Sequence, residues 1–454
     1  MKTYPVKKNE TIEIEIIDLT HEGLGVGKVD HYPLFIENSL PGEKVKVLVL
    51  KVGNKFGYGK VLERLTESPD RVALTDESLL RTGIAPLQHM TYEAQLLFKQ
   101  RQLENVLSKI SKLPDVPVLP TIGMAEPKGY RNKAQIPVRK IDGQLETGFY
   151  RKNSHDLVPI QDFYIQDPVI DQAILTIRDI LGRFSVKIYD EKSHVGNLRH
   201  IIIRRGHYSH QMMVVLVTRT GKIFKHEQIV EEILKELPEV VSIIQNINPD
   251  QTNVILGKES KVLYGKEYIE DQLLGKTYRI SAPSFYQVNT EQTEYLYQTA
   301  MDFAGLTKED IVIDAYCGIG TIGLSMADRV KQVYGVEIVK EAIDDAKINA
   351  FTNGIENATF KVGAAEKVMQ KLKETGIHPT VLVVDPPRKG LTTAFIETSM
   401  EMKPERIIYI SCNPATLARD LKQFNEEYEV KKIQPVDLFP QTHHVESVTL
   451  LERK

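Results

Sequence analysis

The sequence predicts an α/β protein with a Rossmann-like, doubly wound C-terminal sheet, preceded by an OB-like β-barrel and an α+β central section. Three observations predict this arrangement. Residues 7–65 alternate apolar and polar side chains between glycine-containing turns. Residues 120–285 mix strand and helix patterns. From residue 286 onward, apolar runs alternate with helical stretches, which is typical of a mostly parallel sheet.

The length of the chain requires more than one hydrophobic core. It has 454 residues, whereas single domains usually stop growing near ~250–300 residues. We predict domains at residues 1–65, 66–285 and 286–454. No apolar run approaches the ~18 residues that cross a bilayer, and the N-terminus carries no signal-peptide core. We therefore expect a cytoplasmic protein, a monomer, with no membrane partner.

Charge and cysteine content exclude several classes of protein. The two cysteines, Cys317 and Cys412, cannot form a disulfide framework or a cysteine-based metal cluster, so we expect no bound metal. The net charge of −3 excludes a uniformly basic coat for nucleic acid. Any RNA contact must therefore use local basic patches.

The N-terminal element is a β unit of about five short strands, which suits an OB-like barrel. Its strand segments are TIEIEIID, GLGVGKV, YPLFIENSL, EKVKVLVLKV and GYGKVLERL. OB-like barrels commonly bind nucleic acids, although this spacing fits a β-barrel without a ligand equally well. A linker, LTESPDRV, and an amphipathic helix, YEAQLLFKQRQLENVLSKI, follow.

The central section carries a local excess of positive charge. Its strands include HIIIRRG and QMMVVLVT, and its helix is EQIVEEILKEL. Residues 128–152 contain seven basic residues against Asp142 and Glu146: Lys128, Arg131, Lys133, Arg139, Lys140, Arg151 and Lys152. Such a run fits a phosphate-binding surface, or simply a solvated face.

A nucleoside-binding turn opens the C-terminal domain. In IVIDAYCGIGTIGLSMA, Gly318 and Gly320 allow the backbone to approach a ligand closely. Glu337 ends the next strand, where a carboxylate accepts hydrogen bonds from ribose hydroxyls. Gly318, Gly320 and Gly323 have the G-x-G-x-x-G spacing, but we interpret the turn Cys-Gly-Ile-Gly-Thr as lacking the arrangement that faces a pyrophosphate. A cofactor without phosphates, S-adenosylmethionine, therefore fits better.

Two further strand ends carry reactive groups. Asp385 follows TVLVV and Cys412 follows RIIYIS, so both are expected at the ligand-binding edge of the sheet. Asp385 fits a turn-capping role as well, and a lone cysteine such as Cys412 is often a buried filler. A reactive thiolate needs a polar site, which Asn413 and the backbone amides after the strand could provide.

A thiolate beside a methyl sulfonium suggests methylation of uracil C5. Attack of sulfur on C6 makes C5 nucleophilic, and the C5 proton must then be removed by a base. Glu446 in FPQTHHVE is our candidate for this base, and His443 or His444 is the alternative.

Several segments resemble the RNA uracil-5-methyltransferase family. They are DAYCGIGTIGL, DPPRKG followed by IIYISCNPAT, and VDLFPQTHHVE. The resemblance implies a class I methyltransferase fold with Cys412 as nucleophile and Glu446 as proton acceptor. It also implies cofactor contacts from four residues: Gln287 (in SFYQVN), Tyr316, Glu337 and Asp385.

The N-terminal part of the chain resembles this family as well. The β unit resembles the TRAM domain of members that act on ribosomal RNA, and GYRNKAQIPV resembles an RNA-contacting segment, which implicates Arg131 and Lys133. Some relatives bind an iron–sulfur cluster through a C-x-x-C pair, but Thr82 and Ala85 occupy these positions here. We therefore expect no cluster, and packing must hold that loop. Ala364 stands where relatives often have a polar residue, so one adenine contact is expected to be lost.

Together the patterns indicate an enzyme that transfers a methyl group from S-adenosylmethionine to C5 of uridine, and the family resemblance implies that the uridine lies in 23S ribosomal RNA, at one or two sites. The alternatives are a transfer-RNA uridine C5-methyltransferase and a non-catalytic, ribosomal-RNA-binding assembly factor.

Overall fold

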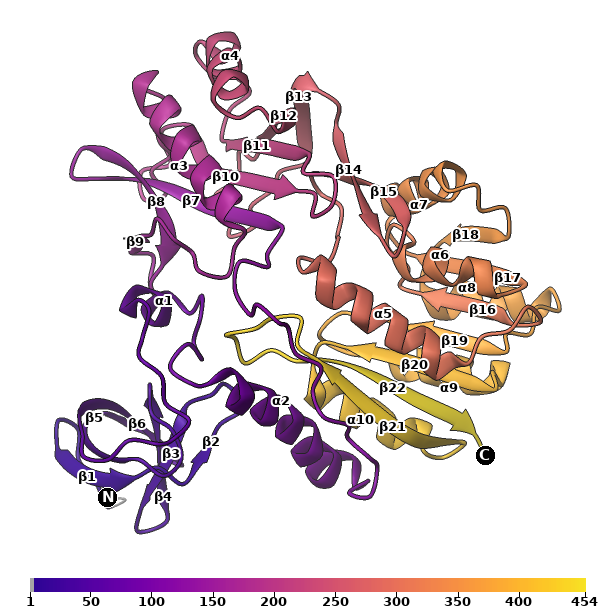
Figure 1. The fold of residues 1–454 in the computed structure, drawn as a ribbon, viewed down its shortest axis with the longest axis horizontal. Helices are drawn as coiled ribbons and strands as arrows, with labels where there is room; N and C mark the ends of the chain where they lie inside the picture. The colour runs from indigo at the N-terminus through magenta and orange to yellow at the C-terminus, as the bar shows by residue number, and fades with distance from the viewer. Residues whose placement is uncertain (1–3) are drawn as a thin grey trace.

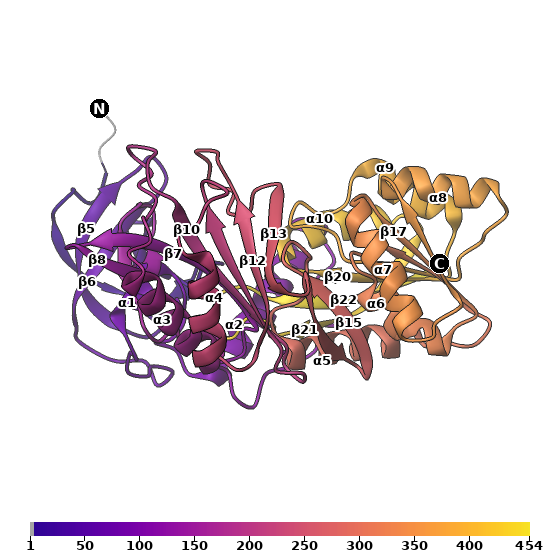
Figure 2. The ribbon, with the colours of Figure 1, turned by 90° about the horizontal axis from the view of Figure 1, so that it is seen from above.

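The computed structural model describes residues 4–454, which form three units. Figure 1 shows the N-terminal barrel at the lower left, the central sheet at the top, and the C-terminal sheet with its helices at the right. Seen from above, the C-terminal sheet lies at the end opposite the barrel (Figure 2). No helix in this described part of the chain combines the length and apolar character that crossing a bilayer would need.

The N-terminal unit is a six-stranded sheet in the order β1-β5-β6-β4-β3-β2. We predicted about five strands, and the additional one is the two-residue β2. Alternating valines of β5 point into the core, because successive side chains in a strand face opposite sides. The strands are β1 (Thr11–Glu15), β2 (Asp18–Leu19), β3 (Gly25–Val29), β4 (Tyr32–Glu37), β5 (Lys44–Val52) and β6 (Gly57–Arg64).

Two helices follow the barrel. The first, α1 (Glu77–Thr82), begins at Asp76, whose side chain accepts a hydrogen bond from the Ser78 amide. The second, α2 (Tyr92–Val106), continues into a π-helical turn, η1 (Leu107–Ser111). Leu103 and Leu107 pack into the core of the C-terminal domain. The packing therefore crosses the predicted boundary at residue 285, and the division into domains stays a prediction.

The central unit is a seven-stranded sheet in the order β13-β12-β11-β10-β7-β8-β9, with helices α3 (Pro168–Arg183) and α4 (His226–Glu236). Its strands are β7 (Lys133–Ile141), β8 (Gln144–Tyr150), β9 (Leu157–Pro159), β10 (Leu198–Arg205), β11 (Met212–Thr218), β12 (Val240–Ile247) and β13 (Glu259–Gly265). A separate hairpin, β14 (Tyr268–Leu273) and β15 (Lys276–Ser281), packs Tyr278 and Ile280 into the core of the C-terminal domain.

The C-terminal unit is a doubly wound sheet in the order β18-β17-β16-β19-β20-β22-β21, as the alternating pattern predicted. The first five of these strands are parallel, and β22 is antiparallel to both of its neighbours. The strands are β16 (Ile311–Ala315), β17 (Gln332–Glu337), β18 (Ala358–Val362), β19 (Val381–Val384), β20 (Arg406–Ser411), β21 (Tyr428–Val436) and β22 (Glu446–Arg453).

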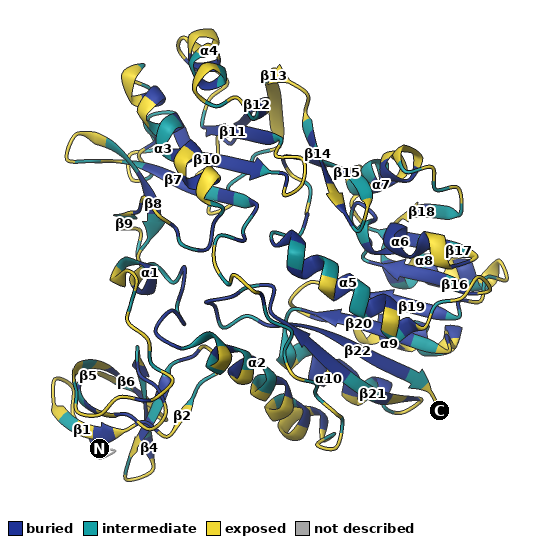
Figure 3. Ribbon diagram, in the orientation of Figure 1, coloured by how far each residue is buried: buried dark blue, intermediate teal, exposed yellow. Residues whose placement is uncertain are grey.

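Helices cover both faces of this sheet, so its central strands are buried (Figure 3). One face carries α5 (Thr290–Ala304), α6 (Thr321–Met326), η2 (Ala327–Arg329) and α7 (Lys340–Thr352). The other carries α8 (Ala365–Glu374), α9 (Thr393–Met402) and α10 (Pro414–Phe424). Ligands of such sheets bind beyond the carboxyl ends of the strands, and the cavity described below lies there.

Candidate active site

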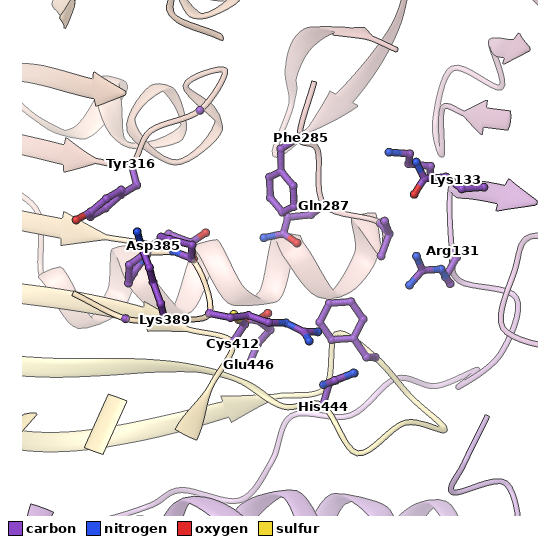
Figure 4. Close-up of a pocket in the computed structure, with 18 of the residues that line it drawn as sticks. Arg131, Lys133, Phe285, Gln287, Tyr316, Asp385, Lys389, Cys412, His444 and Glu446 are labelled. Atoms are coloured by element: carbon purple, nitrogen blue, oxygen red, sulfur yellow. The ribbon is translucent and has the colours of Figure 1, made fainter. Parts of the chain in front are cut away.

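A cavity of about 1140 Å³ opens at the carboxyl edge of the C-terminal sheet, between this sheet and the central unit. Every site residue that the sequence predicts lines it: Arg131, Lys133, Gln287, Tyr316, Glu337, Asp385, Cys412 and Glu446. Figure 4 shows Cys412 and Glu446 close together, with Arg131 and Lys133 on the central-unit side. The central and C-terminal units thus bring distant parts of the sequence to one site.

The turn after β16 leaves space for a ligand. Tyr316 has a left-handed backbone (φ 67°), and Gly318 and Gly320 follow with φ of 53° and 87°. A Cβ built on Gly318 would meet no atom within 4 Å, although Gly318 lines the cavity. The space in front of this glycine is therefore open to a bound molecule.

Glu337 is fixed at the end of β17 by backbone amides. Its Oε1 accepts hydrogen bonds from the amides of Ile338 (2.7 Å) and Val339 (3.0 Å), and its Oε2 accepts one from Gly318 (3.3 Å). A carboxylate oxygen has more than one lone pair, so the anchored group can still accept hydrogen bonds from ribose hydroxyls. Glu337, Tyr316 and Gln287 all line the cavity.

Cys412 directly follows the last residue of β20, and Glu446 is the first residue of the neighbouring strand β22. The last pair of the β20–β22 ladder is Ser411 with Ser447, so Cys412 and Glu446 are the residues that come next to this pair. The Glu446 carboxylate lies near enough to the thiol to raise the Cys412 pKa. The nucleophile and the base that we predicted are thereby brought to the same point of the cavity.

The charge state of this pair is set by burial and by Arg388. Burial raises the pKa of the Cys412 thiol to about 12, with help from Glu446 and Asp385, while Arg388 lowers it. Burial also raises the pKa of Glu446 well above its usual value, an effect that Asp385 adds to and Arg388 opposes. Burial likewise raises the pKa of Asp385, to about 7. Arg388 is therefore the cation that favours the ionised forms.

The Asn413 side chain is hydrogen-bonded to groups other than the Cys412 thiol, so a role of Asn413 in stabilising the thiolate stays a prediction. Its side-chain oxygen caps α10 by accepting from the Ala415 amide (3.0 Å), and its Nδ2 donates to the Arg388 carbonyl (3.1 Å). The side chain is thus occupied in positioning the segment that carries Arg388. The sequence held a signal for Arg388, because it follows Asp385-Pro386-Pro387 at a strand end.

Helix α2 holds the loop between β21 and β22, which leads into Glu446. The buried Lys99 places Nζ 2.5 Å from Asp437 Oδ1 and donates to the Phe439 carbonyl (3.0 Å). Gln95 makes two reciprocal hydrogen bonds with Gln441, of 3.0 and 2.9 Å. Sequence reasoning missed this connection, because it depends on tertiary packing.

The loop at Thr82–Ala85 is held by hydrogen bonds and packing. Thr82 Oγ1 donates to the Ser78 carbonyl (2.8 Å), and Ala85 is fully buried. The Leu87 amide then donates to the Gln441 carbonyl (3.0 Å), which ties this loop to the one that precedes Glu446. Within residues 4–454, no group of three or more His, Cys, Asp or Glu side chains is arranged to hold a metal ion.

The basic residues of segment 128–152 do not form one surface. Arg131 and Lys133 line the cavity, whereas Arg139 on β7 contacts Tyr150 on β8 and Glu191 in the segment between α3 and β10. Burial lowers the pKa of Lys133 to about 7, with Arg204 and Arg131 adding to the effect. A phosphate near Lys133 would favour its charged form.

The sheet order and the nucleoside crevice at its carboxyl edge define the class: a methyltransferase dependent on S-adenosylmethionine, with an N-terminal barrel of the kind that binds RNA. Residues 91–454 match the model of the tRNA (uracil-5-)-methyltransferase family, and residues 5–62 match the TRAM domain. The chain therefore belongs to the tRNA (uracil-5-)-methyltransferase family.

Relatives and a solved structure agree with this assignment. The chain is 61% identical to an uncharacterized RNA methyltransferase of Enterococcus faecalis, over 100% of this chain and 99% of the relative. It is 57% identical to one of Lactiplantibacillus plantarum, over 99% of each chain. The crystal structure of Pyrococcus abyssi tRNA (uracil-54, C5)-methyltransferase with S-adenosyl-L-homocysteine superposes with a TM-score of 0.78 at 27% identity, covering 97% of this chain and 99% of that one. The predicted family, fold and cofactor are confirmed.

Proposed function

We propose that this protein methylates C5 of uridine in 23S ribosomal RNA through a covalent bond between Cys412 and C6 of the target base. The observation that carries the proposal is the register of β20 and β22, which places Cys412 near Glu446 in the cavity that Glu337 and Asp385 also line. A nucleophile and a base are needed on one reacting ring, and this pair supplies both.

When bound, S-adenosylmethionine supplies the methyl group as a sulfonium. The Cys412 thiolate forms a bond to C6, and the electron pair of the C5–C6 double bond makes C5 the nucleophile that takes the methyl group. Glu446 then accepts the C5 proton. The electrons of that C–H bond restore the C5–C6 double bond and expel the Cys412 thiolate. The target uridine must leave the RNA stack for its ring to reach Cys412.

Four other residues are proposed to bind the cofactor: Gln287, Tyr316, Glu337 and Asp385. Gln287 is held from the central unit, because the Asn132 side chain donates to its carbonyl (3.0 Å). Tyr316 packs against Phe395, with ring centroids 5.4 Å apart. Arg131 and Lys133 are proposed to contact RNA phosphates across the cavity.

Two variants test the chemistry. We expect Cys412→Ala to abolish methyl transfer and to retain S-adenosylmethionine binding by calorimetry. We expect Glu446→Gln to accumulate a protein–RNA adduct that survives a denaturing gel, because C5 keeps its proton and elimination stalls. Normal turnover in either variant would contradict the covalent scheme. A tritium-transfer assay with the unaltered protein separates the enzyme from a non-catalytic assembly factor, which would transfer no label.

The choice of RNA is a separate question. The resemblance of the barrel to the TRAM domain of family members that act on ribosomal RNA supports ribosomal RNA. The transfer-RNA alternative is supported by the Pyrococcus abyssi tRNA (uracil-54, C5)-methyltransferase, whose structure covers 97% of this chain, so a barrel of this kind is compatible with either RNA. Mapping 5-methyluridine in ribosomal and transfer RNA, with and without the protein, decides between them and counts the target uridines.

A further inference from the structure

Three aromatic rings gather on the outer surface of the barrel. Phe35 on β4 stacks on Phe56, with ring centroids 4.9 Å apart, and Tyr58 on β6 lies 6.0 Å from Phe35 and 5.7 Å from Phe56. Phe56 and Tyr58 are 39% and 38% exposed. We call these three residues the aromatic platform.

The barrel core does not account for these rings. Leu34 and Ile36, the neighbours of Phe35 in β4, are fully buried, so Phe35 faces the opposite side of the sheet. Gly57 and Gly59 alternate with Tyr58 in the same way on β6. Clustered rings on an outer face leave apolar surface in water, and such patches mark binding surfaces.

Lysines surround the platform. Lys60 lies two residues beyond Tyr58 on the same face of β6, and Lys51 pairs with Tyr58 across the sheet. Lys28 lies two residues beyond Val26, the partner of Phe35 on β3. All three lysines are exposed. Rings that stack on bases, beside cations that attract phosphates, are the chemistry of a single-stranded nucleic-acid site.

The platform is continuous with the cavity. Glu37 lies two residues beyond Phe35 on β4, a rise of about 7 Å. Its carboxylate accepts a hydrogen bond from Lys152 Nζ (2.7 Å). Lys152 also covers Gly83, since a Cβ on that glycine would lie 2.8 Å from Lys152 Cε. Gly83 itself lines the cavity. One layer of side chains therefore joins the platform to the cavity rim.

We propose that the aromatic platform stacks unpaired bases of the RNA whose target uridine enters the cavity. This inference rests on the proposed function for the identity of the substrate. The platform would be a second attachment point for the RNA, in addition to the cavity, and would hold the RNA strand next to the reacting nucleotide. The lysines favour a polyanion over a second copy of this chain as the occupant.

The test uses the full chain and a fluorescein-labelled oligouridine, with an RNA duplex of the same length for comparison. We expect Phe56→Ala to bind oligouridine about tenfold more weakly, equivalent to ~1.4 kcal/mol, because one base loses its stacking partner. Duplex binding should not change, since paired bases do not expose their faces. Phe56→Tyr should restore binding, because it keeps a ring.

Phe351→Ala is the matched control, because Phe351 is an exposed phenylalanine (87%) on α7 of the C-terminal unit. It should bind both probes as the unaltered protein does. The proposal fails if Phe56→Ala binds oligouridine normally, if the unaltered protein does not bind it, or if sedimentation shows a dimer that Phe56→Ala dissociates. If the unaltered protein transfers no methyl group, the proposed function is refuted. The proposal for the aromatic platform is still tested in that case by the binding of oligouridine.

Discussion

Replacement of Lys99 tests how α2 holds the loop that precedes Glu446. Lys99 is completely buried, and burial lowers its pKa while Asp437 raises it. Lys99→Met removes the cation and leaves the Asp437 carboxylate buried, with the Tyr92 hydroxyl (3.0 Å) as its remaining side-chain donor. Breaking a buried ion pair in this way costs about 3–5 kcal/mol. At about 2–4 °C per kcal/mol, the melting temperature should fall by about 6–20 °C.

Activity should fall along with stability. Lys99 also donates to the Phe439 carbonyl, and Phe439 lines the cavity seven residues before Glu446. We expect a lower kcat at a temperature where the variant is still folded, with little change in S-adenosylmethionine affinity. Thermal unfolding followed by circular dichroism and single-turnover methyl transfer measure the two effects separately.

Two controls make the reasoning refutable. The double variant Lys99→Met with Asp437→Leu should recover much of the stability, because a buried pair replaced by apolar groups is often neutral. Lys340→Met removes an exposed pair with Asp344 (2.7 Å), and should change stability by less than about 1 kcal/mol. Two results would show that the ion pair does not fix the loop. One is a loss of stability in Lys99→Met as small as that in Lys340→Met, and the other is no recovery of stability in the double variant.

Three other predictions follow from the site and from the barrel. Because the Cys412 pKa is raised to about 12, the thiolate fraction grows with pH, so the single-turnover rate should rise between about pH 6 and 9; a flat profile would contradict thiolate attack. Glu337→Gln should weaken S-adenosylmethionine binding at least about tenfold in calorimetry without unfolding the protein, and unchanged affinity would remove Glu337 from the cofactor site. Arg71→Met leaves the buried Glu43 without its main cation, so the barrel should lose about 3 kcal/mol and become sensitive to limited proteolysis; the protease pattern of the unaltered protein would refute this role.

The C-terminal sheet could be predicted from local sequence patterns, namely apolar runs that alternate with helical stretches. Its central strands are buried on both faces, and three of its strands lead to Glu337, Asp385 and Cys412, so these residues could be assigned to one edge from the sequence. Glu446 could be selected as a base, but its position near Cys412 depends on the pairing of β22 with β20. That register is set by tertiary packing, which a single sequence does not encode in any short segment.

The role of α2 was hidden for the same reason. Its apolar pattern predicts a helix but not the surface on which the helix packs. Lys99 and Gln95 look like exposed polar residues in the sequence, whereas both are fully buried against the loop before Glu446. Buried polar side chains of this kind are recognisable only when their partners, here Asp437 and Gln441, are located in space.

The proximity of Cys412 and Glu446 imposes an order on the charges of the proposed reaction. The negative form of Glu446 raises the Cys412 pKa, and burial disfavours ionisation of either group. A thiolate is therefore easiest to form while Glu446 is neutral. Once sulfur is bonded to C6 it carries no charge, so the repulsion that opposed ionisation of Glu446 is gone. Glu446 then releases its own proton to the solvent in the cavity, and Arg388 favours the carboxylate that is left, which accepts the C5 proton. The same local geometry thus favours one anion at a time, first on sulfur and then on the carboxylate.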